Sequence, residues 1–401
     1  MSRQNNELDI DNREEVIFII NSPYPNYAGG IENWLYNISS RISDRCRITI
    51  VSIKNEDYPK LYDVNEDITI LTVKTLSSYN FLKKIIRGYM SIIDIMIASF
   101  LMKRVVSKHF SSSNKFLYII CLDTMFCVRA GLSLKKKNKL CKVIASSRGP
   151  HAEIYSKNYP LFKSYFFNLE KKMLNDVDEI WGNGEDTIID LKNKGYKASL
   201  MLNGVDYERF SVEDSTTEVE QIFNRLPSVI NVATLLPIKG IKELLDAANY
   251  IINSLKVEVN FVFVGKGDAD YYLKYAESKN ISEYVFFLGH KTNPSKYIQS
   301  AKIATCLSGG SGLSMAAIEC MASGTPTLAW DTPVYHQFNR QYDYFKLIEQ
   351  NNHIELGIGI IEMINNYDHY IKVAHQAKEY AEKYDWNNVT EFFLSKLTPN
   401  D

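Results

Sequence analysis

The sequence predicts an α/β protein made of two doubly wound domains, each built on a parallel sheet. Short apolar runs rich in Val and Ile recur along the chain, and such runs are typical of strands buried on both faces. Segments with apolar residues at helical spacing alternate with these runs. The alternation starts afresh at residue 229, which indicates two domains of similar size rather than one large sheet.

The first domain begins with a βαβ unit. Residues 16–21 (VIFIIN) predict a strand, and the Gly-containing loop over 24–30 leads into a helix predicted over 31–42. A second strand is predicted over 46–53 and completes the unit. Further strands of this domain are predicted over 116–121, 142–146 and 179–182.

The second domain repeats this pattern. A strand predicted over 229–233 is followed by a helix over 240–253 and by a strand over 257–264, which ends in a Gly-Lys-Gly turn. The remaining predicted elements are strands over 285–288, 303–307 and 327–330, a helix over 314–322, and a helical tail over 368–397 with a break at 384–387.

The boundary between the domains is expected near 201–214, where the turn signal Asn203-Gly204 precedes the polar stretch 211–220. We therefore expect three parts: a first domain over 1–200, a second over 201–380, and a C-terminal helix over 381–401 that packs back on the first domain. Ligands of open parallel sheets bind beyond the carboxyl ends of the strands. The site is thus expected in a cleft between two facing domains.

Composition and charge exclude several classes of protein. With 46 Lys and Arg against 47 Asp and Glu in 401 residues, the chain has no basic excess for nucleic acid. The six cysteines form no CxxC pair and the seven histidines form no cluster, so we expect reduced thiols and no metal site. The polar N-terminus is typical of neither a signal peptide nor a transit peptide, and the apolar stretch 91–102 is too short for a membrane span. We therefore expect a cytoplasmic protein.

Five segments, in order and spacing, resemble the motifs of retaining glycosyltransferases with the GT-B fold, specifically glycosyltransferase family 4. They are 28–32 (AGGIE), 203–206 (NGVD), 232–240 (VATLLPIKG), 263–267 (FVGKG) and 311–326 (SGLSMAAIECMASGTP). The resemblance covers about residues 16 to 390 and implies two Rossmann-like domains facing a cleft. It also implies sugar transfer from a nucleotide-diphosphate-sugar, which is a co-substrate, without a cofactor or a metal.

The donor would bind to the second domain. The glycine-rich segment before residue 314 leaves N–H groups open at a helix N-terminus, which suits a diphosphate. Lys239 suits a point charge for the same group, although a solvated lysine at a helix start is the plainer interpretation. Glu319 lies in a small, apolar helix and by resemblance binds the ribose, with a capped structural carboxylate as the alternative. The resemblance assigns donor binding to Gly30, Thr234, Lys239, Gly265, Ser311, Gly312, Leu313, Ser314 and Glu319.

The first domain would supply further catalytic and acceptor groups. The segment 147–151 (SRGPH) resembles one found in polysaccharide-building members of the family. By this resemblance Arg148 and His151 act with Lys239, touching the donor sugar or the negative charge that develops on the leaving diphosphate. A solvent-exposed loop histidine without a role is the alternative. Acceptor-side residues would be Gly29, Gly30 and Glu32, where the glycines allow close backbone approach or simply form a tight turn.

Two departures from the family pattern bear on activity. Thr234 stands where the family usually has Arg, and Ser311 where it usually has the first of two glutamates. Three explanations remain open. The donor sugar is unusual, or another cation replaces the missing Arg, or catalysis has been lost. The candidate cations are Lys266, Lys291 and Arg340.

The favoured function is sugar transfer to a saccharide or lipid-linked oligosaccharide in capsule, O-antigen or exopolysaccharide synthesis. The alternative is a catalytically inert GT-B subunit that organises a partner glycosyltransferase, and a sugar-nucleotide epimerase on the same fold is a third interpretation. Basic residues flank the apolar stretch 91–102, so the segment 83–104 is a candidate for contact with an anionic membrane surface at the inner face of the cell membrane. A buried helix with a solvated basic rim is the alternative for that segment.

Overall fold

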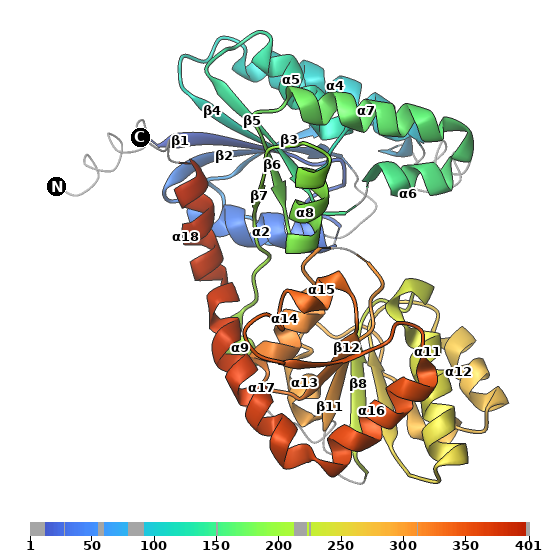
Figure 1. The fold of residues 1–401 in the computed structure, drawn as a ribbon. Helices are drawn as coiled ribbons and strands as arrows, with labels where there is room; N and C mark the ends of the chain where they lie inside the picture. Colours follow the sequence, from blue (N-terminus) through green and yellow to red (C-terminus); the bar gives the residue numbers. More distant parts are fainter. Residues whose placement is uncertain are drawn as a thin grey trace. The chain divides into compact units, whose positions relative to one another are not determined.

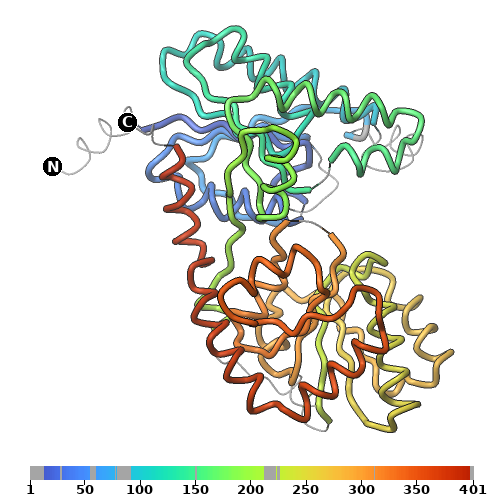
Figure 2. Tube along the Cα trace, in the orientation of Figure 1, coloured from blue at the N-terminus to red at the C-terminus, as the bar shows by residue number. Residues whose placement is uncertain are grey.

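The structure is a computed structural model that describes residues 13–27, 29–54, 60–78, 92–149, 151–211, 223, 226–310 and 312–397. The chain forms two compact units. Unit 1 comprises Met1–Leu202 with Thr390–Asp401, and unit 2 comprises Asn203–Val389. Each unit is built on one parallel sheet with helices packed around it (Figure 1, Figure 2). This arrangement confirms the predicted fold class.

The described part of unit 1 contains a sheet of seven parallel strands in the order β3-β2-β1-β4-β5-β6-β7. The strands are β1 (Glu14–Ile19), β2 (Cys46–Ile53), β3 (Thr69–Val73), β4 (Leu117–Cys121), β5 (Cys141–Ser147), β6 (Glu179–Gly182) and β7 (Ala198–Leu200). The helical elements are α2 (Gly30–Ile42), η1 (Leu76–Ser78), α4 (Ile92–Phe110), α5 (Phe126–Lys135), α6 (His151–Asn158), η2 (Pro160–Phe162), α7 (Lys163–Asp176) and α8 (Glu185–Asn193).

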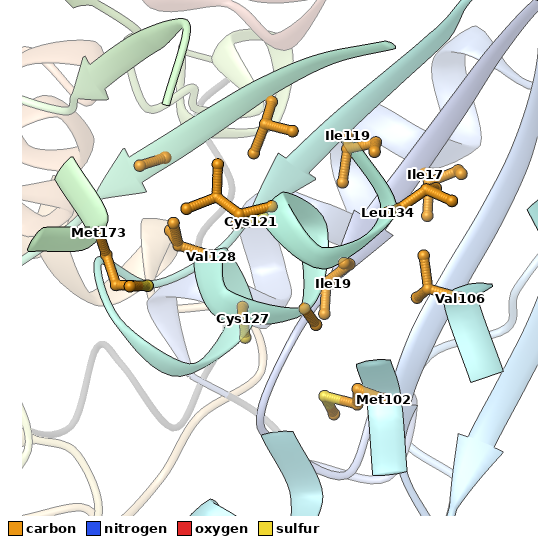
Figure 3. Packing of buried hydrophobic residues seen from close by; sticks show 14 of the residues in the cluster. Ile17, Ile19, Met102, Val106, Ile119, Cys121, Cys127, Val128, Leu134 and Met173 are labelled. Atoms are coloured by element: carbon orange, nitrogen blue, oxygen red, sulfur yellow. The ribbon is translucent and has the colours of Figure 1, made fainter. Parts of the chain in front are cut away.

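Side chains of β1 alternate between the two faces of this sheet, as the period of a strand requires. Ile17 and Ile19 belong to a buried cluster with side chains of α4, α5, α7 and α8 (Figure 3), among them Met102, Val106, Val128, Leu134 and Met173. Phe18 packs instead against Trp34 of α2, with the ring centroids 6.3 Å apart. Because both faces are covered, the strand is apolar from Val16 to Ile19, and this run could be recognised in the sequence.

The described part of unit 2 contains a sheet of six parallel strands in the order β10-β9-β8-β11-β12-β13. The strands are β8 (Ser228–Val232), β9 (Asn260–Val264), β10 (Val285–Phe287), β11 (Ile303–Cys306), β12 (Thr327–Trp330) and β13 (Phe345–Ile348). The helical elements are α9 (Tyr207–Ser211), η3 (Pro237–Lys239), α11 (Ile241–Asn249), the π-helical η4 (Tyr250–Ser254), α12 (Ala269–Ser278), η5 (Ser282–Tyr284), α13 (Ser295–Ser300), α14 (Met315–Ala322), α15 (Pro333–His336), α16 (His353–Asn365), α17 (Tyr367–Ala381), η6 (Glu382–Tyr384) and α18 (Trp386–Leu397).

The last helix, α18, belongs to both units. Its first turn is part of unit 2, where Gly204 leaves room for the Trp386 ring: a Cβ on Gly204 would lie 2.4 Å from it. Residues from Thr390 onward are part of unit 1. There the ring of Phe393 packs against three aromatic rings of the unit 1 core, at centroid distances of 6.1, 5.9 and 5.6 Å from Phe18, Trp34 and Trp181. The core of unit 1 therefore includes the C-terminus of the chain.

Three strands were not predicted, and all three lie at sheet edges: β3, β7 and β13. An edge strand has only one neighbouring strand and needs no continuous apolar run, which is why β3 is partly exposed along its length. The strand predicted over 257–264 begins only at Asn260. Before it, Lys256 has a φ of 58° and the Val257 N–H still bonds to the Ile251 carbonyl (3.2 Å), so the chain is completing a helix end.

Residues 92–102 of the apolar stretch form the beginning of α4, whereas residues 83–91 lie outside the described part of the chain. Asp94 is fully buried there, and its Oδ2 accepts a hydrogen bond from Thr75 Oγ1 at 2.9 Å. The buried charge is thus part of the packing of this helix. Among the helices that the structure describes, none combines the length and the hydropathy that crossing a membrane requires.

Candidate functional site

The two central strands of the unit 2 sheet, β8 and β11, bring a lysine and a serine together just beyond their carboxyl ends. The direction in which successive strands are added reverses here, and we call this place the turning point of the sheet: β9 and β10 lie on one side of β8, whereas β12 and β13 lie beyond β11. Such turning points are where open parallel sheets bind ligands. Lys239, the last residue of η3, donates from Nζ to Ser308 Oγ at 3.0 Å. Burial lowers the pKa of the Lys239 ammonium, as expected for a cation partly removed from water.

Ser308 organises the loop between β11 and α14. Its Oγ also accepts from the Gly310 N–H at 3.4 Å. Its own N–H donates to the hydroxyl of Tyr335, a fully buried residue of α15, at 3.1 Å. The loop is therefore held by side chains from two other elements, η3 and α15.

This loop leads into the N-terminus of α14. Ser314 caps the helix by accepting from the Ala317 N–H at 3.3 Å. Gly312 has a φ of 87°, in the left-handed region that favours glycine, and Leu313 is buried with its carbonyl bonded to the Asn203 side chain at 3.1 Å. Backbone N–H groups at the start of this helix thus follow directly on the Lys239–Ser308 pair.

Glu319 lies farther along α14 and is half-buried. Burial raises the pKa of its carboxyl to about 7, and the nearby Arg209 of α9 opposes that rise. The Arg209 guanidinium is itself held by the Thr292 carbonyl at 2.5 Å. Glu319 therefore changes its charge near neutral pH.

Gly265 and Gly240 are glycines because neighbouring backbone lies too close for a side chain. A Cβ on Gly265 would lie 1.8 Å from the Ala233 carbonyl oxygen, at the end of β8. A Cβ on Gly240 would lie 2.8 Å from the Leu307 carbonyl oxygen, and Gly240 has a φ of 70°. Both positions bring loops together at the turning point of the sheet. Gly265 is thus explained by packing whether or not it contacts a donor.

Thr234 and Ser311 are the positions that depart from the family pattern. Thr234 is exposed in the loop after β8, and Ser311 lies outside the residues that the structure describes. Among the cations considered as replacements for the missing Arg, Lys266 and Arg340 are exposed and Lys291 is half-buried. The cation that the structure places at the Ser308 loop is Lys239.

The unit 1 sheet turns between β1 and β4, and polar residues follow both strands. Asn21 Nδ2 donates to Asp123 Oδ2 at 3.2 Å. Directly after Asp123, the Thr124 hydroxyl lies 3.3 Å from His151 Nδ1 and donates to Glu170 Oε1 at 2.5 Å. His151 is the first residue of α6, and Glu170 lies in α7. The predicted His151 is thus bonded into a network and is not an isolated loop histidine.

Arg148 follows β5 and is covered by aromatic and polar groups. Its guanidinium carbon lies 3.9 Å from the centroid of the Trp34 ring, and its Nε donates to Ser146 Oγ at 3.1 Å. Burial lowers the pKa of Arg148 to about 9, so the side chain remains a cation at neutral pH. Stacking on an indole fixes the plane of the guanidinium.

The loop after β1 brings Glu32 back against Gly29. A Cβ on Gly29 would lie 2.5 Å from Glu32 Oε2, whereas a Cβ on Gly30 would meet no atom within 4 Å. Burial raises the pKa of the Glu32 carboxyl. A side chain at position 29 would displace the Glu32 carboxylate, whereas Gly30 lies at an open surface.

Sequence reasoning missed four side chains of these arrangements: Ser308, Tyr335, Thr124 and Glu170. Ser308 and Thr124 follow strand ends, and that position was a usable signal. Tyr335 and Glu170 reach their partners from other elements. In the part of the chain that the structure describes, no group of three or more His, Cys, Asp or Glu is placed to hold a metal ion.

Comparison with known proteins adds a family match inside unit 2. Residues 213–384 match the family described as "Glycosyl transferases group 1". Over 201 residues the chain is 27% identical to the poly(ribitol-phosphate) alpha-N-acetylglucosaminyltransferase of Staphylococcus aureus, a match that covers 49% of this chain and 41% of that protein. The chain spans less than half the length of this relative and of two further curated ones, at 47% and 41%.

Solved structures match nearly the whole chain. Sucrose-phosphate synthase from Thermosynechococcus elongatus matches with a TM-score of 0.77 at 14% identity, over 96% of this chain and 98% of that one. The Anabaena protein HepE in complex with UDP matches with a TM-score of 0.72 at 14% identity, over 96% and 99%. The fold is GT-B. At these identities the likeness concerns the fold alone.

Proposed function

We propose that the chain is a retaining glycosyltransferase that moves a sugar from a nucleotide-diphosphate-sugar to a saccharide or lipid-linked oligosaccharide in surface-polysaccharide biosynthesis. The observation that carries this proposal is the half-buried Lys239 bonded to Ser308 at the turning point of the unit 2 sheet. That pair lies within the segment that matches the glycosyl transferases group 1. It combines a cation with the N-terminus of α14, which is the chemistry that binds a diphosphate.

In this proposal the donor contacts follow from the groups present. The Lys239 ammonium and the N–H groups at the start of α14 bind the diphosphate, and their charge favours its departure. Glu319 in its ionised form accepts hydrogen bonds from the ribose hydroxyls. Gly312, Leu313 and Ser314 supply the backbone of the loop.

The transfer itself breaks the bond between the anomeric carbon and the diphosphate oxygen and forms a bond to an acceptor hydroxyl oxygen on the same face. The acceptor's proton passes to the leaving diphosphate, so the products are the lengthened saccharide and a nucleoside diphosphate. Arg148 and His151 contact the donor sugar or the charge on the leaving group, and Gly29, Gly30 and Glu32 lie on the acceptor side. We propose that no metal takes part, and an unchanged rate in EDTA would support this.

We also propose that unit 1 touches an anionic membrane surface through the exposed face of α4, at a cytoplasmic location. Ile93, Met96 and Phe100 lie at helical spacing and are 59%, 40% and 54% exposed. Arg104 lies over the Phe100 ring at 5.7 Å, so a cation borders the apolar face. Phe100→Ser should reduce sedimentation with phosphatidylglycerol vesicles, whereas Phe116→Ser, which alters another exposed aromatic residue of unit 1, should not. Equal sedimentation of both variants would exclude this surface.

A catalytically inert subunit that organises a partner enzyme is the second candidate. Two features favour it: the exposed Thr234 in place of the expected Arg, and Ser311 in place of the first glutamate. The bonded Lys239 and the raised pKa of Glu319 favour a working donor site.

A nucleotide panel separates the two candidates. Melting temperatures are measured with UDP, GDP, ADP, dTDP and CMP for the wild type, Lys239→Met and Lys242→Met. Lys242 is an exposed lysine of α11 paired with Asp246 at 3.0 Å, so its variant is the matched control. One nucleotide should stabilise the wild type and Lys242→Met, by about 2.7 kcal/mol at a hundred times its Kd, and should fail to stabilise Lys239→Met.

The absence of any shift in the wild type would favour the inert subunit. A nucleotide that stabilises Lys239→Met as strongly as the wild type would remove Lys239 from the site. Release of free nucleotide only when an acceptor is present would then distinguish a transferase from an epimerase.

A further inference from the structure

A chain of three polar side chains ends at His151, and each comes from a different element of unit 1. Thr124 follows β4, His151 begins α6, and Glu170 lies in α7. The Thr124 hydroxyl oxygen is 3.3 Å from His151 Nδ1 and 2.5 Å from Glu170 Oε1. Thr124 is almost fully buried, so water does not compete for its hydroxyl.

The number of available protons determines which of these three side chains donates each hydrogen bond. A carboxylate accepts hydrogen bonds and donates none, so the single proton of the Thr124 hydroxyl goes to Glu170. The same hydroxyl oxygen is then left as an acceptor, and the bond to His151 needs a proton on Nδ1. Neutral His151 is therefore the Nδ1–H tautomer, with the lone pair on Nε2.

A threonine just before a helix often caps it, but Thr124 does not cap α5. Asp123 caps this helix instead, because its Oδ1 accepts from the Met125 and Cys127 N–H groups, both at 2.9 Å. The hydroxyl of Thr124 therefore does not cap the helix and bonds to Glu170 and His151 instead.

The three side chains stand on a common apolar support. Met125, Ala152 and Phe166 belong to one buried cluster. Met125 is next to Thr124, Ala152 is next to His151, and Phe166 precedes Glu170 by one helical turn. Tyr155 of α6 reinforces this support, with its ring 5.5 Å from that of Phe166. The spacing between the polar groups is therefore fixed by packing.

We propose that Thr124 and Glu170 are positioning residues that hold His151 with the lone pair of Nε2 presented to the substrate. A lone pair accepts a hydrogen bond from a hydroxyl and repels an oxyanion. His151 then binds a hydroxyl of a sugar, and it does not stabilise the negative charge on the leaving diphosphate, a role left to Arg148 and Lys239. The proposal deepens the proposed function and rests on it for the identity of the substrate.

Nitrogen NMR of the imidazole rings tests the chain of bonds without any substrate. The full-length protein, with its histidines labelled with ¹⁵N, is measured at about pH 8.5, roughly two units above the ordinary imidazole pKa. His151→Gln assigns the signals of His151 among the seven histidines. We expect the proton on Nδ1 in the wild type and in Thr124→Ser. In Thr124→Val and in Glu170→Leu, the proton should move to Nε2.

A wild-type His151 with its proton on Nε2 would overturn the proposal. The same holds if Thr124→Val or Glu170→Leu, with an unchanged melting temperature, keeps the proton on Nδ1. A sugar-transfer assay then reads the consequence: kcat of Thr124→Val should fall roughly 10-fold, with recovery in Thr124→Ser and an unchanged Kd for the nucleotide. An unchanged kcat would overturn the role of the tautomer in transfer. A wild type with the expected tautomer but no transfer activity would refute the proposed function and leave the chain of bonds established.

Discussion

Both sheets turn between their two central strands, and the groups gathered at the two turning points differ in chemistry. In unit 2 a half-buried lysine is bonded to a serine in the loop that leads to the start of α14, so this part of the sheet edge carries positive charge and N–H donors. At the turning point of the unit 1 sheet, the Thr124 hydroxyl is hydrogen-bonded to both His151 and Glu170. The same topology thus presents a lysine and helix N–H donors in one unit and three hydrogen-bonded side chains in the other.

This difference shows that the sheet decides where a site lies, and that a few loop residues decide what it binds. The backbone of unit 2 is held tightly at its turning point, where Gly265 and Gly240 approach neighbouring carbonyl groups. The turning point of unit 1 is instead supported by an apolar cluster under its polar chain. A rigid backbone suits N–H donors, and a packed support suits side-chain donors and acceptors.

The largest expected effect comes from testing that contrast in backbone packing. Gly265→Ala would place a Cβ 1.8 Å from a backbone oxygen, which obliges the loop to move, and it should cost roughly 4 kcal/mol of unfolding free energy. Gly131→Ala in α5 of unit 1 meets only side chains, the nearest being Cys121 Sγ at 2.9 Å, and should cost about 1 kcal/mol. Urea midpoints measure both. Equal losses would contradict the contrast.

Glu319 should give unit 2 a pH dependence of stability. Its folded pKa of about 7 lies above the ordinary carboxyl value, so the folded protein keeps a proton that the unfolded chain releases. The contribution is fully present below about pH 4.3 and is lost as pH rises through 7, by roughly 3 to 4 kcal/mol. Glu319→Gln should remove this fall, whereas Glu277→Gln, at an exposed position, should retain it. The same dependence of the unfolding free energy on pH in all three proteins would show that Glu319 is not its source.

Tyr335 should matter for nucleotide binding through the Ser308 loop. Tyr335→Phe keeps the buried ring and removes the acceptor of the Ser308 N–H, which should weaken nucleotide binding about 5-fold, close to 1 kcal/mol. Tyr284→Phe, whose hydroxyl donates to the exposed Glu258 at 2.9 Å, is the control. Isothermal titration provides the comparison, and equal Kd values for both variants would show that the loop keeps its form without this bond.

The smallest effect is expected where the two turning points should be independent. His151→Gln changes the unit 1 chain and should leave the Kd for the nucleotide within about 2-fold, since the proposed nucleotide contacts belong to unit 2. Titration of this variant alongside the wild type measures it. A large loss of affinity would mean that the imidazole itself binds the nucleotide, and the separation of roles would fail.

The inner strands of both sheets were predictable because both of their faces are covered and their sequences are rich in apolar residues. The run 46–53 matches β2 at both ends, and 179–182 matches β6. The edge strands β3, β7 and β13 were missed, since pairing on one side only requires no such run. The local sequence pattern identifies strands whose two faces are both buried. The location of edge strands depends on pairing between segments that are distant in the sequence.

The site was partly predictable for a similar reason. Lys239, Gly312 and Ser314 stand next to strand ends and helix starts, and the chain itself shows such positions. Glu170 reaches Thr124 across 46 residues, and Tyr335 reaches Ser308 across 27, so only the packing of whole elements brings them together.

The membership of α18 in both units has a consequence for biosynthesis. Phe393 packs against Phe18, Trp34 and Trp181, yet it leaves the ribosome only after the residues of unit 2 up to Val389. During synthesis the aromatic core of residues 1–202 therefore lacks Phe393 until all residues of unit 2 up to Val389 have emerged. The aromatic core of unit 1 is therefore completed only after the residues of unit 2 have been synthesised, and a ribosome that stalls before residue 390 releases a protein whose unit 1 core lacks Phe393.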